Sequence, residues 1–183
     1  MARRADDMKT PGNNFCSECG TKLEYRFHLM ENKEVPYCAA CGDYRFPLFN
    51  VACSMIVMDP DRKKILLIKQ YGRDKNILVA GYVNLGEDAE NTVRREIKEE
   101  LGVGVTDVRF NRTHYHARTN VLMLNFTVVL ETEDVQPNKE IDSYNWYPIE
   151  EARREVWQGS LAHQFIEGYL NGGNYDFGRN NDD

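Results

Sequence analysis

The sequence predicts an α+β protein, in which a small cysteine-bound unit precedes a domain of many strands and one prominent amphipathic helix. Three observations lead to this class. Short apolar runs separated by turn signals recur from residue 51 onwards, residues 88–101 have helical periodicity, and two Cys-x2-Cys pairs precede both. A chain of 183 residues has room for one ordinary domain and a small appendage.

The expected organisation has four parts. Residues 1–14 form a flexible start, 15–46 the cysteine unit, 47–171 the main domain and 172–183 a flexible tail. Within the main domain, we expect strands at residues 51–58, 64–70, 77–83, 105–114, 121–131 and 142–147. Besides the helix at 88–101, a helix opens at 148–152 and an amphipathic one covers 160–170.

The helix at 88–101 carries two different faces. Its i, i+4 stripe is apolar and suits packing on a sheet; the stripe consists of Ala89, Val93, Ile97 and Leu101. Glu96, Glu99 and Glu100 share the neighbouring flank, whereas Arg95 is expected to point elsewhere. Like charges this close repel one another, and a divalent cation such as Mg²⁺ relieves the repulsion through oxygen ligands. The alternative is a solvated acidic face, which the preceding glycine-containing loop disfavours.

The cysteines indicate a second metal site. The four are arranged as two Cys-x2-Cys pairs with eighteen residues between them, and each pair is followed by glycine; they are Cys16, Cys19, Cys38 and Cys41. Four thiolates form a closed, structural Zn²⁺ site, and the spacing leaves room for a hairpin at residues 23–29 and 34–37. Disulfides are the competing interpretation, which the absence of a secretory signal disfavours. The remaining Cys53 is expected to be a buried core thiol.

Charge and hydropathy exclude several classes. A formal net charge of −6 provides no general basic field, so DNA is not an expected partner. We find no run of roughly 18 apolar residues that could span a membrane, and the start of the chain lacks the apolar core of a signal peptide. We therefore expect a cytoplasmic protein that does not bind membranes.

A spaced motif surrounds the acidic helix. Gly81 is followed after five residues by Glu87 and, after seven more, by Arg95-Glu96-Ile97-Lys98-Glu99-Glu100-Leu101-Gly102-Val103. This pattern resembles the Nudix box, G-x5-E-x7-R-E-U-x-E-E-x-G-U, in which U is an aliphatic residue. The resemblance implies a Nudix α/β/α sandwich with a mixed sheet. It also implies hydrolysis of a nucleoside diphosphate linked to a second moiety.

The resemblance suggests roles for individual residues. The expected Mg²⁺ or Mn²⁺ ligands are Glu96, Glu99, Glu100 and the distant Glu140, with the carbonyl of Ala80 or Gly81 nearby. Either Glu100 or Glu140 serves as general base, and Arg95 pairs with Glu87 to fix the loop against the helix. Gly81 permits a sharp turn and a close backbone approach, and Gly102 ends the helix.

A zinc ribbon followed by this box is similar to the NADH pyrophosphatase (NAD⁺ diphosphatase) branch of the family. That branch carries an S-Q-P-W-P-F-P segment after the box, whereas this chain has Thr113-His114-Tyr115-His116-Ala117-Arg118-Thr119-Asn120. The candidate substrate-binding residues are His114, Tyr115, His116 and Asn120, together with Ala162 in the last helix. A surface or loop-lining role is the alternative for the two histidines.

The leading functional hypothesis is a divalent-metal-dependent diphosphatase acting on a small-molecule nucleotide diphosphate such as NAD(H) or ADP-ribose. A second keeps the chemistry and changes the substrate to a nucleotide sugar, a nucleoside triphosphate or capped RNA. A third is a non-catalytic nucleotide sensor, although a sensor would not need every carboxylate of the box. The resemblance and a packing role for the ribbon also suggest a homodimer.

Overall fold

The computed structural model describes residues 14–173, which form two compact units divided between Phe49 and Asn50. The sequence predicts this division after residue 46, three residues before its position in the structure. The flexible start and tail expected at 1–14 and 172–183 lie outside the described residues, except for residues 14, 172 and 173. In the part of the chain that the structure describes, each helix is too short or too polar to pass through a bilayer.

The first unit is a three-stranded antiparallel sheet next to the cysteine loops. Its strands are β1 (Glu24–His28), β2 (Lys33–Cys38) and β3 (Asp43–Tyr44), in the order β1-β2-β3. The β1–β2 pair is the hairpin expected from the cysteine spacing. Buried apolar side chains in this unit are Cys16, Val35 and Cys38. A core this small does not stabilise a fold without a metal or another cross-link.

The second unit is built on a mixed six-stranded sheet. Its strands are β4 (Asn50–Met58), β5 (Lys64–Gln70), β6 (Val79–Tyr82), β7 (Val105–His116), β8 (Val121–Leu130) and β9 (Ile141–Pro148). Five follow the order β7-β8-β4-β5-β9, and β6 also pairs with β4. The β4–β8 pair is parallel, whereas the other pairs are antiparallel. Each expected strand is present, although β6 is shorter and β7 two residues longer than predicted.

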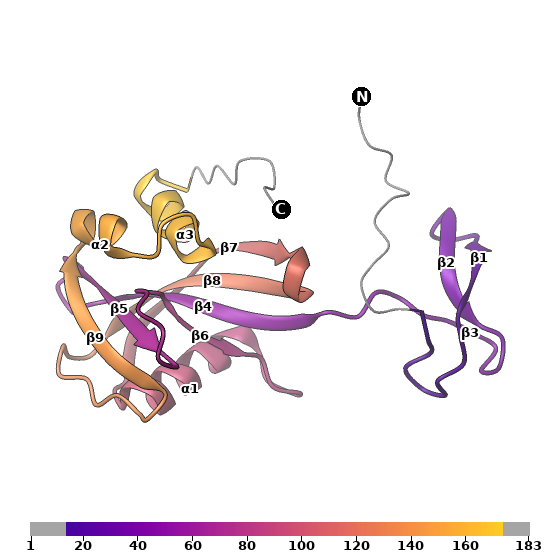
Figure 1. Ribbon diagram of the computed structural model, residues 1–183, viewed down its shortest axis with the longest axis horizontal. Helices are drawn as coiled ribbons and strands as arrows, with labels where there is room; N and C mark the ends of the chain where they lie inside the picture. The colour runs from indigo at the N-terminus through magenta and orange to yellow at the C-terminus, as the bar shows by residue number, and fades with distance from the viewer. Residues whose placement is uncertain (1–13, 174–183) are drawn as a thin grey trace. The chain divides into compact units, whose positions relative to one another are not determined.

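Helices cover both faces of this sheet (Figure 1). Helix α1 (Ala89–Leu101) lies on one face, and α2 (Ile149–Glu155) and α3 (Leu161–Leu170) lie on the other. Because side chains alternate along β4, Met55 packs with the α1 side, whereas the adjacent Ile56 packs in the cluster that contains Phe165 of α3. The result is three layers with a core on each side of the sheet, as the α+β class and the expected sandwich predict.

One edge of β4 is shared by two strands. Val57 and Met58 pair with β5, whereas residues 52–55 pair with β6. The short β6 leads directly through a loop to α1, so it carries the motif glycine to the helix. Within β6, Gly81 is opposite Cys53 on the α1 face, and Tyr82 is opposite Ala52 on the other face. Consecutive residues at the end of β6 therefore point to opposite faces of the sheet, Gly81 to the α1 face and Tyr82 to the other.

Candidate active site and zinc site

Helix α1 has well-defined ends that set the positions of its glutamates. Asp88 caps the first turn, where its side chain accepts a hydrogen bond from the backbone N–H of Asn91 at 2.8 Å. Gly102 ends the helix in the left-handed conformation with φ 73°, and its N–H donates to the carbonyl of Lys98. This is the terminal role that the sequence predicts for Gly102.

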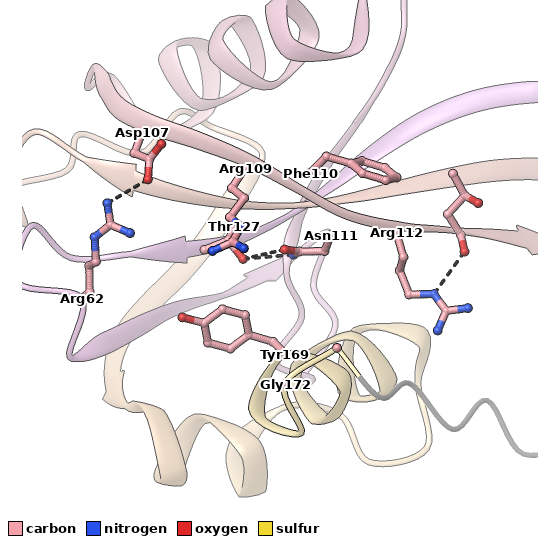
Figure 2. Close-up of a pocket in the computed structure, with 11 residues that line it drawn as sticks. Arg62, Asp107, Arg109, Phe110, Asn111, Arg112, Thr127, Tyr169 and Gly172 are labelled. Atoms are coloured by element: carbon pink, nitrogen blue, oxygen red, sulfur yellow. Dashed lines mark hydrogen bonds and ion pairs between the residues drawn. The ribbon is translucent and has the colours of Figure 1, made fainter.

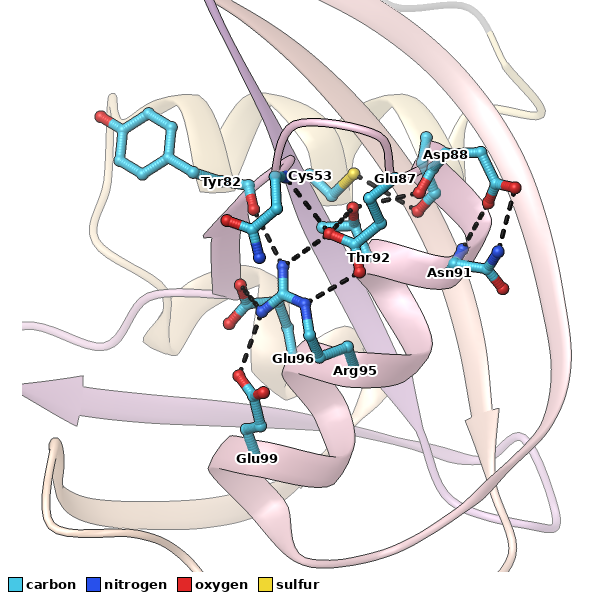
Figure 3. A network of polar contacts seen from close by, with 11 residues as sticks. Cys53, Tyr82, Glu87, Asp88, Asn91, Thr92, Arg95, Glu96 and Glu99 are labelled. Atoms are coloured by element: carbon cyan, nitrogen blue, oxygen red, sulfur yellow. Dashed lines mark hydrogen bonds and ion pairs between the residues drawn. The ribbon is translucent and has the colours of Figure 1, made fainter.

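Arg95 is the centre of the polar network around the box (Figure 3). Its Nε and Nη2 each lie 2.9 Å from a carboxylate oxygen of Glu87, which is the expected ion pair in a bidentate form. Nη1 donates to Glu96 at 2.6 Å and to Glu99 at 3.0 Å, and Nη2 also donates to the carbonyl of Tyr82 at 3.1 Å. The expectation that Arg95 points away from the acidic flank is therefore wrong.

The physical reason is local charge. A long guanidinium side chain can turn back along the helix surface, and three carboxylates attract it more strongly than solvent does. The hydrogen bonds from Arg95 are the main cause that lowers the pKa of Glu87 to about 2, and Thr92 and the backbone of Asn84 add to the effect. The same contacts raise the pKa of Arg95. The loop between β6 and α1 is thereby tied to the first turns of the helix.

Gly81 has a steric role rather than a turn-forming one. It lies inside β6 without a positive φ, so the predicted sharp turn at this position is wrong. The predicted close approach is present, and its partner is a side chain: a β-carbon added at Gly81 would lie 2.0 Å from Cδ of Glu96. Glycine is therefore the one residue that leaves space for Glu96 against the strand.

Glu100 is the buried member of the acidic group. Its side chain is 4% exposed, and Nε2 of Gln70 donates to its Oε2 at 3.2 Å. Burial, followed by repulsion from Glu96 and Glu140, raises the pKa of Glu100 to about 7. A carboxyl group with this pKa can hold or release a proton near neutral pH, as a general base requires.

Glu140 lies just before β9 and is hydrogen-bonded to a residue at the end of β5. Tyr71, which follows β5, donates a hydrogen bond to Oε2 of Glu140 at 3.1 Å. The backbone N–H of Asn138 donates to the carbonyl of Glu100 at 2.9 Å, and the Asn138 side chain accepts from the N–H of Glu140. The segment before β9 is thus fastened to the C-terminal end of α1, and Glu140 contributes to the electrostatic field at Glu100.

The donor set suits Mg²⁺ or Mn²⁺, because these cations prefer carboxylate oxygens. The carboxylates do not converge on one point, however. Among the described residues, the four cysteines are the one group of at least three metal-type ligands whose donor atoms come together. Glu96 and Glu99 are held by Arg95, and Glu100 by Gln70. Ala80 is adjacent to Gly81 in β6, so its carbonyl belongs to the strand that faces this group.

The candidate substrate-binding residues lie elsewhere. The β7–β8 turn is closed by a hydrogen bond from Tyr115 Oη to Asn120 Oδ1 at 2.8 Å and by a contact of His116 Nδ1 with Thr119 Oγ1 at 2.7 Å. His114 is opposite Met123 in β8, and Met123 packs with the core on the α3 side. Ala162 packs against that same core. The sheet therefore separates His114 and Ala162 from the glutamates of α1, whereas Tyr115, opposite Leu122, belongs to the α1 face.

Three contributors to the site are absent from the residues proposed on sequence grounds: Gln70, Tyr71 and Tyr82. The polar Gln70, which closes β5 shortly after its apolar run at residues 65–68, was an available signal for the first two. Tyr82 follows the motif glycine and is 58% exposed, on a short strand that pairs with β4 alone among the strands of the sheet. Its ring points away from α1, while its carbonyl accepts from Arg95 (Figure 3).

The cysteine cluster in the first unit has the dimensions of a tetrahedral thiolate site. The four sulfur atoms lie within 4.8 Å of one another; Cys16 and Cys41 are 3.9 Å apart, Cys19 and Cys38 3.5 Å, and Cys19 and Cys41 3.3 Å. A tetrahedron with Zn–S bonds of about 2.3 Å has edges of roughly 3.8 Å, so the cluster fits Zn²⁺. The two loops are equivalent: Gly20 N–H donates to Cys16 O and Gly42 N–H to Cys38 O, both at 2.9 Å.

Arg45 lies beside this cluster. Its Nε donates to Sγ of Cys16 at 3.2 Å, and the pKa of Cys16 is lowered to about 6 by hydrogen bonds from the backbone of Cys19 and Glu18 and from Arg45, against the opposing effect of burial. Thiolates are the form that binds metal. Arg45 therefore favours the ligand state of Cys16, a contribution that the cysteine spacing alone does not reveal.

Helix α1 and its preceding loop lie within a stretch of the chain that matches a known protein family. Residues 48–165 match the family described as NUDIX domain, and this stretch contains the whole acidic network. The chain belongs to the Nudix family. Both the family resemblance and the mixed-sheet sandwich fold that it implied are confirmed.

Relatives of this Nudix chain include the NAD-capped RNA hydrolases NudC of Pseudomonas aeruginosa and Vibrio cholerae. The first is 29% identical over 161 residues, which cover 86% of this chain and 56% of that protein. The second is 28% identical over 157 residues, which cover 84% of this chain and 56% of that protein. This Nudix chain thus spans a little over half the length of these curated relatives.

Solved structures share the fold. A NUDIX hydrolase from Nitrosomonas europaea has a TM-score of 0.63 at 20% identity, covering 87% of this chain and 93% of that one. The NUDIX domain of Shewanella oneidensis NrtR, complexed with ADP ribose, has a TM-score of 0.57 at 17% identity, covering 74% and 93% of the two chains. These two structures are similar to this Nudix chain in fold, that is, in how the sheet and its helices are arranged.

Proposed function

We propose that this protein is a divalent-metal-dependent diphosphatase that cleaves the diphosphate linkage of a nucleoside diphosphate joined to a second moiety. The proposed substrate is a dinucleotide such as NAD(H), or ADP-ribose. The observation that carries the proposal is the arrangement of Glu96 and Glu99 around Arg95, with Glu96 against Gly81 and with Glu100 of the same helix buried next to Gln70.

The metal ligands in this proposal are Glu96, Glu99 and Glu100, with Glu140 and the carbonyl of Ala80 or Gly81 as additional donors. Bound Mg²⁺ or Mn²⁺ would lower the pKa of water and neutralise diphosphate charge. Arg95 donates to Glu96 and Glu99, so a cation bound by these two carboxylates would compete with that arginine for them. Arg95 remains tied to Glu87 by its two other contacts.

Glu100 or Glu140 is the proposed general base. Glu140 is supported by its position next to Tyr71, whose hydroxyl orients the carboxylate. Gln70 donates a hydrogen bond that helps to hold the Glu100 carboxyl group in place. A pH–rate profile of each Gln variant distinguishes the two residues.

Recognition of the nucleotide is proposed for the opposite face of the sheet. Tyr82, Ala52, Met123 and His114 form a row across β6, β4, β8 and β7. Such a row spans roughly 14 Å, since neighbouring strands lie about 4.8 Å apart. The exposed ring of Tyr82 can stack on a base, while His114 or His116 contacts the second half of the molecule and Ala162 borders the same face.

A second candidate substrate is the NAD moiety at the end of an RNA chain. The observation that favours it is the similarity to the NudC relatives, which are NAD-capped RNA hydrolases. The charge of −6 opposes it, because long polyanions are attracted by basic surfaces. Free NAD and the NAD cap present the same diphosphate, so the two substrates differ only in the attached polymer.

A homodimer is part of the proposal. The tip of the β1–β2 hairpin displays Leu29 and Met30, which are 86% and 92% exposed. Adjacent exposed apolar side chains of this kind are typical of association surfaces. Light scattering of the full chain and of the Leu29→Ser/Met30→Ser variant tests whether this tip contributes to assembly.

The decisive experiment is a hydrolysis panel with Mg²⁺ and Mn²⁺, with products identified by mass. The substrates are NADH, NAD⁺, ADP-ribose, NAD-capped RNA, a nucleotide sugar and a nucleoside triphosphate. Glu100→Gln is compared with Glu90→Gln, a matched change on the exposed first turn of α1. AMP with nicotinamide mononucleotide, lost only in Glu100→Gln, supports the proposal. Ligand binding without turnover of any compound would instead favour the sensor hypothesis.

A further inference from the structure

The turn that follows β5 has an unfavourable backbone conformation for its sequence. Tyr71 and Gly72 have φ values of 56° and 68°, and the N–H of Arg73 donates to the carbonyl of Gln70 at 3.1 Å. Two central residues with positive φ are characteristic of a type I′ turn, whose first central position favours asparagine, aspartate or glycine. A bulky side chain is strained in this region because its β-carbon crowds the following carbonyl oxygen. The chain nevertheless has a tyrosine there.

Left-handed residues elsewhere in the molecule show what accompanies such strain. Within residues 14–173, the residues other than glycine that have a positive φ are Asn32, Arg62, Tyr71 and Asn120. Asparagine tolerates this region, whereas arginine and tyrosine adopt it less readily. These two each place the side chain on a carboxylate of a distant segment. Arg62 pairs with Asp107 at 2.8 Å and joins the β4–β5 turn to β7 (Figure 2), and Tyr71 contacts Glu140.

Packing does not account for Tyr71. The residue is 67% exposed, so its ring adds little to the core. Its hydroxyl group donates to Oε2 of Glu140 at 3.1 Å. That hydrogen bond is the main cause that raises the pKa of Tyr71, and the charges of Glu100 and Glu96 add to it. The hydroxyl group therefore lies in the electrostatic field of the box glutamates, where an unfavourable backbone conformation indicates a functional role.

The turn is fastened to the segment that carries Glu140. Where β5 ends, its register against β9 shifts, which leaves Asp142 as the extra residue of a β-bulge. The Asp142 carboxylate accepts a hydrogen bond from the backbone N–H of Gly72 at 2.7 Å. Glu140 lies two residues earlier and accepts the hydrogen bond from Tyr71. These two contacts hold the turn in its left-handed conformation and fix the hydroxyl group on Glu140.

We propose that Tyr71 is a positioning residue, held in an unfavourable backbone conformation because its hydroxyl group orients the Glu140 carboxylate towards Glu100. This inference rests on the hydrolase function proposed above, in which Glu140 is a metal ligand or the general base. The hydrogen bond fixes Oε2, which restricts the direction of the second oxygen. The adjacent Gln70 acts in the same way on Glu100, so one turn positions two carboxylates of the site.

The direct test is the conformation of the Glu140 side chain in the metal-free protein. Tyr71→Phe removes the hydroxyl group and keeps the ring, whereas Tyr71→Asn also removes the backbone strain. Three-bond couplings measured by NMR, without metal or substrate, should indicate one rotamer in the wild type and averaging in both variants. Couplings that stay as in the wild type would overturn the proposal, because the carboxylate would then keep its orientation without Tyr71.

Stability and kinetics separate positioning from support of the fold. Tyr71→Asn should melt at the wild-type temperature or about 2–4 °C above it, since asparagine fits the turn. In both variants kcat should fall about tenfold or more, while KM changes less than about twofold. A melting temperature below that of the wild type in Tyr71→Asn, with a loss of kcat in that variant alone, would indicate a structural role and overturn the proposal.

Arg62→Asn is the matched control. It places asparagine at the second strained position and removes an exposed ion pair of small energetic value, so it should leave kcat and the Glu140 couplings unchanged. In a Glu140→Ala background, Tyr71→Phe should cause no further loss of kcat, because the carboxylate that it orients is absent. A further loss of about tenfold there, or wild-type kcat in Tyr71→Phe, would overturn this proposal alone. Absence of turnover in the wild type would overturn the hydrolase function and this proposal together.

Discussion

Glu96 lies so close over Gly81 that a β-carbon at position 81 would be 2.0 Å from Cδ of the glutamate. This contact joins β6 to α1 at the point where the acidic residues meet the strand. The glycine of the motif is therefore explained by the side chain that it accommodates. The geometry also means that Glu96 and Gly81 must be treated as one unit in mutational experiments.

Gly81→Ala should displace Glu96 and reduce both stability and activity. We expect a loss of about 1–3 kcal/mol in the free energy of unfolding, because the inserted methyl group meets a packed side chain. Denaturant unfolding in a double-mutant cycle with Glu96→Ala measures the coupling. Since the truncated side chain no longer occupies the space, Gly81→Ala should cost little in that background. An equal loss in both backgrounds would contradict the steric explanation.

Arg95→Lys should fail to replace arginine despite keeping the charge. A lysine cannot make the bidentate contact with Glu87 while also reaching Glu96 and the carbonyl of Tyr82. We expect a lower melting temperature and kcat/KM reduced about tenfold or more, measured on the best substrate of the panel. Arg94→Lys, one residue away and outside this network, is the matched control. Wild-type kinetics in Arg95→Lys would show that the bidentate geometry of the guanidinium group is not required.

The titration of Glu100 predicts a pH-dependent stability. Its pKa rises from an ordinary value of 4.5 to about 7 in the folded protein, so folding favours the protonated form. The metal-free protein is therefore unaffected by this group below pH 4.5 and loses stability as the pH rises from 4.5 to about 7. The full loss is about 3 kcal/mol at most.

Glu100→Gln should consequently raise the melting temperature of the metal-free protein at pH 8 and leave it nearly unchanged at pH 4.5. Thermal unfolding at the two pH values, with Glu90→Gln as control, provides the measurement. Mg²⁺ should reduce the advantage of the variant at pH 8, because the cation stabilises the ionised carboxylate. The same temperature difference at both pH values would show that Glu100 is not the group responsible.

Zinc should be required for the first unit and not for the second. We expect one Zn²⁺ per chain by elemental analysis, and chelation should unfold residues 14–49 while the NMR signals of the larger sheet persist. Cys38→Ser should have the same effect, because it removes a buried ligand. A protein that keeps the β1–β2 signals after complete zinc removal would contradict this prediction.

Arg45→Ala should weaken zinc binding without removing a ligand. The guanidinium donates to Sγ of Cys16 and offsets part of the thiolate charge, so its loss makes the thiolate less favourable. Competition with a chromogenic chelator should show an affinity at least about tenfold lower. Arg26→Ala, on the exposed β1 strand, is the control for a general loss of charge.

The candidate site residues and the order of helices and strands could be predicted from the sequence, because the patterns that indicate them lie in short stretches of chain. The spacing of the box, the apolar stripe of α1, the capping glycine at 102 and the two cysteine pairs each depend on short stretches of chain. Strands β4 and β5 were recognisable because their apolar runs are separated by turn residues. The Nudix family and the sandwich fold followed from these local patterns.

Contacts between segments distant along the chain required the folded structure. The partners of Arg95, the steric reason for Gly81, the approach of Tyr71 to Glu140 and the pKa of Glu100 depend on how α1, β6 and the end of β5 pack together. The left-handed turn after β5 and the β-bulge in β9 also arise from strand pairing. Residue spacing specifies which groups share a helix face, but distances, burial and charge compensation are properties of packed elements, and only the tertiary structure decides them.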